Sequence, residues 1–185
     1  MADFKSTFGR DPQYYFTAPG RIEVSGNHTD HQHGCVMAAA INLETRGWVA
    51  LSDKPEINMV SEGHTGCRIS LDDLSFKEEA KGTPGALVAG IAKQFADRGA
   101  KLQGFDIYVT SEVLPGSGMS SSASFEVMIG NVFNYLFFDT FLATSSCFNL
   151  NSVIRRLYAI ASSIGFKSSL WIFSIREISA ISCSV

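Results

Sequence analysis

A run of glycines and serines in the second half of the chain restricts both the fold that the chain can adopt and the ligands that it can bind. Residues 115–124 read Pro-Gly-Ser-Gly-Met-Ser-Ser-Ser-Ala-Ser, and a long apolar stretch follows. Glycines let a backbone approach a ligand closely, and the first amides of a helix point outward, where the helix dipole favours negative charge. The run therefore predicts a phosphate-binding loop at a helix N-terminus, in preference to an ordinary serine-capped turn. It is no P-loop, because Met119 rather than a lysine follows Gly118, and Ser121 replaces the third glycine of a dinucleotide motif.

A second polar segment lies near the N-terminus. Residues 26–34 carry two amides, one carboxylate and three histidines between two glycines. Asp30 can accept from two hydroxyls and Asn27 can donate and accept, which suits a polyhydroxylated ligand, while Arg21 upstream can stabilise a phosphate or an alkoxide. The three histidines do not lie on an expected helix or strand that would orient their rings toward one ion, which disfavours a metal site. A sugar site and a solvated turn stay open as interpretations.

Bulk composition narrows the class of protein. The chain has 185 residues and 45% apolar residues, enough for one domain with a core. A net charge of −3 excludes an electrostatic case for nucleic acid. Four scattered cysteines without a C-x-x-C pair disfavour a zinc site or a disulfide framework, and the first ten residues do not form a signal peptide. These features predict a cytoplasmic protein.

Strand and helix patterns are mixed along the chain. Apolar residues recur at three- and four-residue steps after Pro84, which predicts a helix that ends near Gly99. A second, buried helix is expected over 120–138. Strands without a regular βαβ repeat favour an α+β fold over a doubly wound sheet. The expected strands are 14–16, 22–25, 43–52, 57–61, 67–71 and 105–109, with a turn at 18–21 between the first two and a hairpin-like turn at 62–66.

The two polar segments together resemble the galactokinase branch of the GHMP kinases. Residues 18–30 are similar to A-P-G-R-x-x-x-x-G-E-H-T-D, and residues 116–127 are similar to G-x-G-L-S-S-S-A-S-L-E-V. Phe8-Gly9-Arg10 with Pro12 also looks like the lead-in of that family. Two motifs in the expected order make the resemblance specific. It covers about residues 1–139.

The resemblance implies a GHMP-kinase N-terminal domain of the ribosomal-protein-like split β-α-β type. It also implies transfer of the ATP γ-phosphate to the anomeric hydroxyl of galactose, with Mg²⁺. By position, Arg21 stabilises the charge on the reacting oxygen, and Ser122 is the hydroxyl nearest the metal ion. The implied sugar-binding residues are Asn27, His28, Thr29 and Asp30, and the implied nucleotide-binding residues are Ser61, Gly116, Ser117, Gly118, Met119, Ser120, Ser121 and Ser122.

Two of the chain's departures from the family pattern bear on its function. Asn27 stands where the signature has glutamate, which leaves the choice of sugar open. Residues 140–185 contain no aspartate, one glycine and eleven serines, so the family's catalytic aspartate segment and third glycine-rich motif are absent. We interpret 1–139 as the GHMP N-terminal domain and 140–185 as an atypical tail that is frameshifted or poorly folded, and we interpret the second domain as missing. A membrane helix over 157–175 is the alternative, but Lys167 and five serines dilute its apolar character.

Two classes of function follow from the missing aspartate. The chain is expected to be a galactokinase-type enzyme by descent that turns over poorly or not at all, since a positioned base is typically worth about 10²- to 10⁴-fold in rate. A non-catalytic sugar- or nucleotide-binding fragment is the alternative. A GHMP kinase for another sugar, such as arabinose, is the second alternative within the enzyme class.

Overall fold

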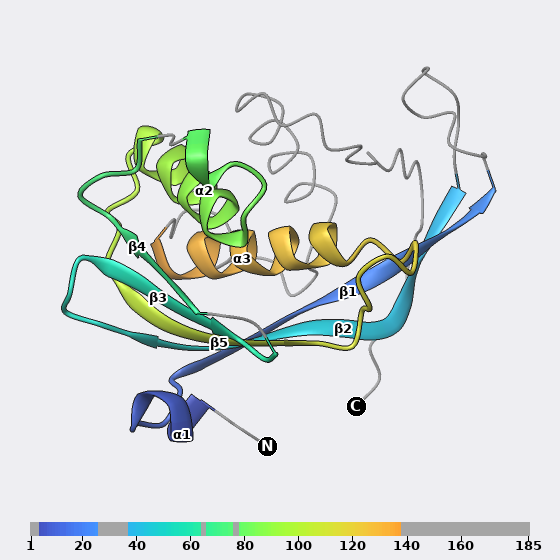
Figure 1. Ribbon diagram of the computed structural model, residues 1–185, viewed down its shortest axis with the longest axis horizontal. Coiled ribbons are helices and arrows are strands. Elements are labelled where there is room, and N and C mark those ends of the chain that lie inside the picture. The colour runs from blue at the N-terminus through green and yellow to red at the C-terminus, as the bar shows by residue number, and fades with distance from the viewer. Residues whose placement is uncertain (1–3, 26–36, 64–65, 76–77, 138–185) are drawn as a thin grey trace, which may run out of the picture.

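A computed structural model describes residues 4–25, 37–63, 66–75 and 78–137. They form a five-stranded sheet in the order β1-β2-β5-β3-β4, antiparallel except for the parallel pair β3 and β5 (Figure 1). The α+β prediction is confirmed. The elements are α1 (Phe4–Phe8), β1 (Tyr14–Ser25), β2 (Met37–Leu51), β3 (Glu56–Ser61), β4 (Cys67–Ser70), η2 (Glu78–Ala80), α2 (Pro84–Asp97), β5 (Phe105–Ser111) and α3 (Ser121–Phe137).

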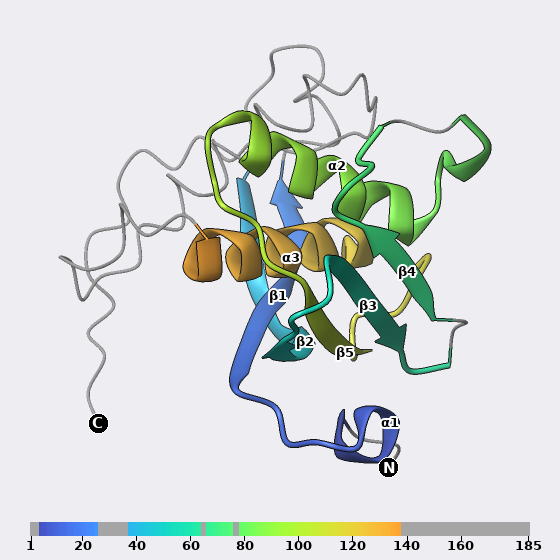
Figure 2. The same ribbon diagram turned by 90° about the vertical axis from the view of Figure 1, so that its left-hand side faces the viewer.

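Helices α2 and α3 cover one face of the sheet, and α1 lies on the opposite face (Figure 2). The main core lies between the sheet and the two long helices. Phe133 of α3 stacks on Phe95 of α2 at 5.7 Å and meets Phe105 of β5 edge-on at 5.5 Å. Contacts of this kind add to the hydrophobic gain of burying three aromatic side chains, so they fix α3 against both neighbours.

The predicted boundaries of α2 follow from its capping residues. Thr83 accepts a hydrogen bond from the Ala86 amide at 3.2 Å, and Pro84 occupies the first helical position. Gly99, with φ of +88°, follows the helix C-terminus. The predicted hairpin also forms, since β3 and β4 pair antiparallel.

The predicted turn at 18–21 is wrong. These residues lie inside β1, which pairs with β2 along its length and shifts register between Pro19 and Arg21. A Cβ at Gly20 would lie 3.0 Å from a methyl group of Val113 and 3.1 Å from the Met119 carbonyl oxygen. The glycine therefore serves a close approach between the strand and the loop that precedes α3, rather than a chain reversal.

The segment before β1 anchors the open face of the sheet. Gly9, with φ of +70°, ends α1, and its amide donates to the Lys5 carbonyl. The Arg10 guanidinium then donates to the Leu51 carbonyl at 2.7 Å and pairs with the Asp106 carboxylate. This gives the Phe8-Gly9-Arg10 lead-in a structural role, the fixing of α1 over β2 and β5.

Candidate functional site

The glycine-serine run forms the loop between β5 and α3, as predicted. Gly116 and Gly118 have φ of +76° and +77°, in the region that other residues rarely adopt. Ser117 stabilises the turn from within, because its hydroxyl donates to the Leu114 carbonyl at 2.6 Å. The loop is mostly exposed and ends where α3 begins.

The start of α3 has the geometry expected of an anion site. The amide of Ser124 makes the first helical bond, to the Ser120 carbonyl at 3.0 Å. The amides of Ser121, Ser122 and Ala123 therefore lie in the helix turn whose donors have no helical acceptor. Ser120 itself has φ of 60°, the one positive φ among the described non-glycine residues. Such backbone strain is typical of functional sites, where the surrounding structure enforces it.

Arg21 is brought to this loop by its own backbone. Its amide donates to the Met119 carbonyl at 3.0 Å, so β1 and the loop are joined at that residue. The two motifs lie about a hundred residues apart in the sequence, yet they share one hydrogen bond. The backbone of Arg21 is therefore held beside the loop that precedes α3.

Ser61 lies at the same edge of the sheet. It ends β3, which runs parallel to β5, and it pairs with Val109. The carboxyl ends of these two neighbouring strands therefore lie on the side of the sheet where the loop begins. The predicted sugar-binding residues Asn27, His28, Thr29 and Asp30 lie outside the described residues.

A buried carboxyl group lies one turn into the helix. Glu126 is 6% exposed, and burial raises its pKa from 4.5 to about 7. Its position in the motif was visible in the sequence, but no sequence pattern indicated that the side chain points inward. A cluster of three or more metal-ligating residues is not present in the ranges that the structure describes. Within the same ranges, no helix is both long and apolar enough to span a bilayer.

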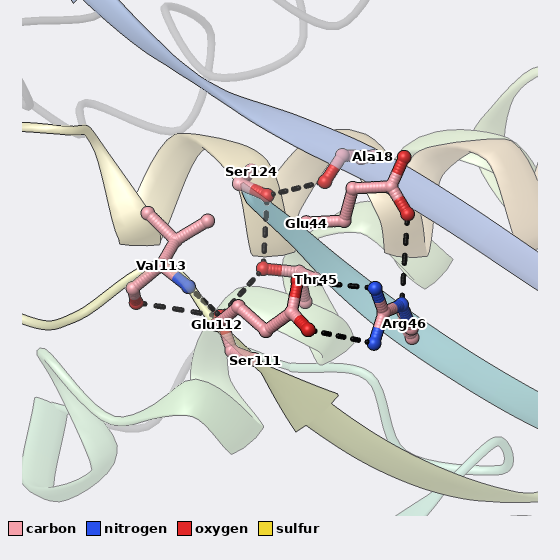
Figure 3. Close-up of polar contacts among 8 residues, drawn as sticks. All are labelled: Ala18, Glu44, Thr45, Arg46, Ser111, Glu112, Val113 and Ser124. Carbon is pink, nitrogen blue, oxygen red and sulfur yellow. Dashed lines mark hydrogen bonds and ion pairs between the residues drawn. The ribbon is translucent and has the colours of Figure 1, made fainter. Parts of the chain in front are cut away.

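Sequence reasoning missed a polar cluster below the loop. Ser124 of α3 contacts the Ala18 carbonyl of β1 and the Thr45 hydroxyl of β2, and Thr45 contacts Ser111 of β5 (Figure 3). Ser124 belongs to the glycine-serine run and is the only member of this cluster that a sequence motif contains. Thr45 and Ser111 carry no local signal, because their partners are 66 and 79 residues away.

Two family models match the chain. The galactokinase galactose-binding signature matches residues 2–51, and the N-terminal domain of GHMP kinases matches residues 86–167. A galactokinase of Clostridium tetani is 33% identical over 136 residues, which are 71% of this chain and 34% of that protein. A galactokinase of Lacticaseibacillus casei is 30% identical over 138 residues, which are 72% of this chain and 35% of that protein. The chain thus spans about a third of the length of these curated relatives.

Solved structures show the same architecture. The Lactococcus lactis galactokinase complexed with galactose superposes with a TM-score of 0.71 at 27% identity, over 90% of this chain and 42% of that one. The Methanococcus jannaschii mevalonate kinase superposes with a TM-score of 0.65 at 15% identity, over 89% of this chain and 51% of that one. The second likeness shows the fold alone.

Proposed function

The chain belongs to the GHMP kinase family and carries the galactose-binding signature of its galactokinase branch, and we propose that it is the N-terminal part of a galactokinase-type sugar kinase. The reaction is transfer of the ATP γ-phosphate to the anomeric hydroxyl of galactose. The hydrogen bond between Arg21 and Met119 is the observation that carries this proposal, because it joins the sugar motif to the phosphate loop.

Each element of the site has a separate task in such a reaction. Phosphoryl transfer depends mainly on positioning and on neutralising charge at the transferred group. The backbone amides of residues 116–122 cradle the triphosphate, and Arg21 stabilises charge that develops on the reacting oxygen. Ser61 borders the nucleotide, and the segment that contains Asn27 and Asp30 lines the sugar. All of these are proposed roles.

Magnesium fits this site as a companion of the nucleotide. Mg²⁺ keeps several waters and commonly takes most of its remaining ligands from substrate phosphates. Ser122 is exposed at the start of α3, so its hydroxyl is available as one ligand from the protein. When bound, the ion supplies charge neutralisation at the β- and γ-phosphates.

We propose that the chain lacks the proton acceptor of the reaction. The sequence has no aspartate after Asp139, and of the described carboxylates near the loop Glu112 is salt-bridged and Glu126 is buried. We therefore propose that this polypeptide, in a cytoplasmic setting, binds nucleotide and sugar but forms sugar 1-phosphate very slowly. Residues 1–139 form the GHMP domain in this proposal, and 140–185 form the atypical tail.

Nucleotide binding tests the role of the loop. Gly118→Ala adds a methyl group at a φ of +77° with open space around it, and Gly63→Ala does the same at +75° in the β3–β4 turn. Both variants carry the same backbone strain, so their stabilities should fall alike. Isothermal titration calorimetry with MgADP should show that Gly118→Ala binds at least about tenfold more weakly than wild type, since a shifted loop loses amide contacts to phosphate. Gly63→Ala should bind as wild type does. Equal affinities in the two variants contradict the assignment of the loop.

The identity of the sugar needs its own experiment. Asn27 replaces the family's glutamate, and this substitution favours a second candidate, a GHMP kinase for another sugar such as arabinose. A calorimetric panel of galactose, arabinose and glucose in the presence of MgADP separates the two. Galactose is expected to bind most tightly, and a clear preference for another sugar overturns the assignment of substrate. Rapid formation of galactose 1-phosphate by the chain overturns the proposal that it lacks a base.

A further inference from the structure

A row of hydroxyl groups lies directly below the phosphate loop. The strand register places Ala18 of β1, Thr45 of β2 and Ser111 of β5 side by side across the sheet. Ser124, in the first turn of α3, lies over this row with its oxygen 2.8 Å from the Ala18 carbonyl and 2.9 Å from the Thr45 hydroxyl (Figure 3). Thr45 lies 2.9 Å from the Ser111 hydroxyl. Thr45 is only 1% exposed and Ser124 only 3%, so water does not replace these contacts.

Counting protons gives the row a direction. Each hydroxyl has one proton, and the Ala18 carbonyl can only accept, so Ser124 donates to it. Because Ser124 has no second proton, Thr45 then donates to Ser124. Ser111 can donate either to Thr45 at 2.9 Å or to the Val113 carbonyl at 3.3 Å. The Val113 amide completes the order by donating to the Ser111 oxygen at 3.2 Å. When Ser111 donates to Thr45, which is its shorter contact, all donors point from the exit of β5 to β1, and hydrogen bonds in such a chain polarise one another.

The row connects the three segments that form the proposed site. Ala18 lies three residues before Arg21 on β1. Ser111 and Val113 lead into the glycine loop, and Val113 packs against Gly20. Ser124 belongs to the helix turn that follows the loop. Thr45 is the one member in contact with two of these segments through its side chain, and it does not belong to the site itself.

A salt bridge on the other face of β2 also joins this strand to the end of β5. Arg46, the next residue, pairs with both carboxylate oxygens of Glu112 at 3.0 Å each, and with Glu44 at 3.5 Å. This pair is partly exposed, so its contribution is modest and depends on salt. The buried contacts of Thr45 restrain the first turn of α3 in direction as well as distance, whereas the apolar contacts of Phe133 act near the other end of the helix.

We propose that Thr45 is a positioning residue, which acts through Ser124 and Ser111 to fix the loop amides and Arg21 in one geometry for phosphate. The choice of phosphate as the ligand rests on the proposed function. The claim that Thr45 fixes the positions of the loop and of Arg21 does not. Valine has the shape of threonine without the hydroxyl, so Thr45→Val interrupts the row at its centre with little change in packing volume. Thr45→Ser retains the hydroxyl. Thr17→Val, at an exposed position on β1, is the matched control.

Amide hydrogen exchange on the full chain tests the structural claim without a ligand. The Arg21 amide reports the junction, because it donates to the Met119 carbonyl. We expect Thr45→Val to exchange this proton about tenfold faster than wild type, the effect of losing roughly one buried hydrogen bond. Amides of the β2–β5 ladder should change much less. Thr45→Ser and Thr17→Val should stay within about twofold of wild type, a difference too small for a lost bond.

Titration with MgADP then links the junction to binding. Thr45→Val should weaken affinity about five- to tenfold, and Thr45→Ser should restore it. An unchanged Arg21 amide in Thr45→Val overturns the proposal, and so does an equal acceleration of the ladder amides, which would indicate a purely structural role. If the Arg21 amide responds but the wild-type chain binds no nucleotide, the positioning role stands and the proposed function fails. If the amide responds and wild type binds, but affinity is the same in Thr45→Val, the link to phosphate is overturned.

Discussion

Replacing Glu126 by glutamine should make the protein more stable at alkaline pH and leave it almost unchanged at acidic pH. The carboxyl group is 6% exposed in the second turn of α3, and burial raises its pKa from 4.5 to about 7. Burial disfavours the charged form, because the ionised carboxylate loses its hydration. Glutamine retains the shape of the side chain and cannot ionise.

The sign and the magnitude follow from linkage. A carboxyl group whose pKa is higher in the folded state binds its proton more tightly there, so it costs nothing below pH 4.5. The cost grows between 4.5 and about 7 and is complete above that. The difference corresponds to about 3 kcal/mol, and relaxation and residual solvent screening reduce it to about 2 kcal/mol. Glu126→Gln should therefore gain about 2 kcal/mol at pH 8 and close to nothing at pH 4.5.

Urea unfolding followed by circular dichroism at pH 4.5, 6, 7 and 8 would measure this difference. Glu79→Gln removes an exposed carboxylate in η2 and is the matched control, since it should leave the pH dependence of wild type unchanged. The reasoning is refuted if Glu126→Gln is no more stable than wild type at pH 8. It is also refuted if the gain is equal at all four pH values, because a pH-independent gain would come from packing rather than from ionisation.

Two further substitutions test the backbone around the site. Ser120→Gly should raise the free energy of unfolding by about 0.5 kcal/mol, because relief of the strained φ outweighs the extra freedom of glycine in the unfolded chain; a lower melting temperature in calorimetry would contradict this. Gly47→Ala should lower it by about 1 to 3 kcal/mol, because the new Cβ would lie 2.7 Å from the Met128 sulfur and 3.3 Å from a methyl of Ile107. Urea unfolding measures that loss, and a change below about 0.5 kcal/mol would show that Met128 moves aside without cost.

Local patterns predicted most of the fold and the position of the glycine loop, whose role in binding stays a prediction. Capping by Thr83 and Pro84 and the spacing of apolar residues are local properties, so the limits of α2 and α3 could be predicted within about two residues. The turn predicted at Pro19-Gly20 was wrong. These residues are common in turns, but pairing with β2 keeps the chain extended there across a register shift. The glycine loop was visible because its chemistry is contained in ten consecutive residues. Thr45 was not, since its role arises from contacts with strands and helices far away in sequence.

Features that cost stability gather at the N-terminal half of α3. Ser120 holds a strained φ there and Glu126 buries a titratable group, while the C-terminal half contributes Phe133, packed between α2 and β5. A helix is stiff along its axis, so packing at one end restrains the other only if the near end is also tied to the sheet. The hydroxyl of Ser124 provides that tie at the first turn. The strained turn is therefore held from both sides, which keeps the amides that lack helical acceptors in one orientation.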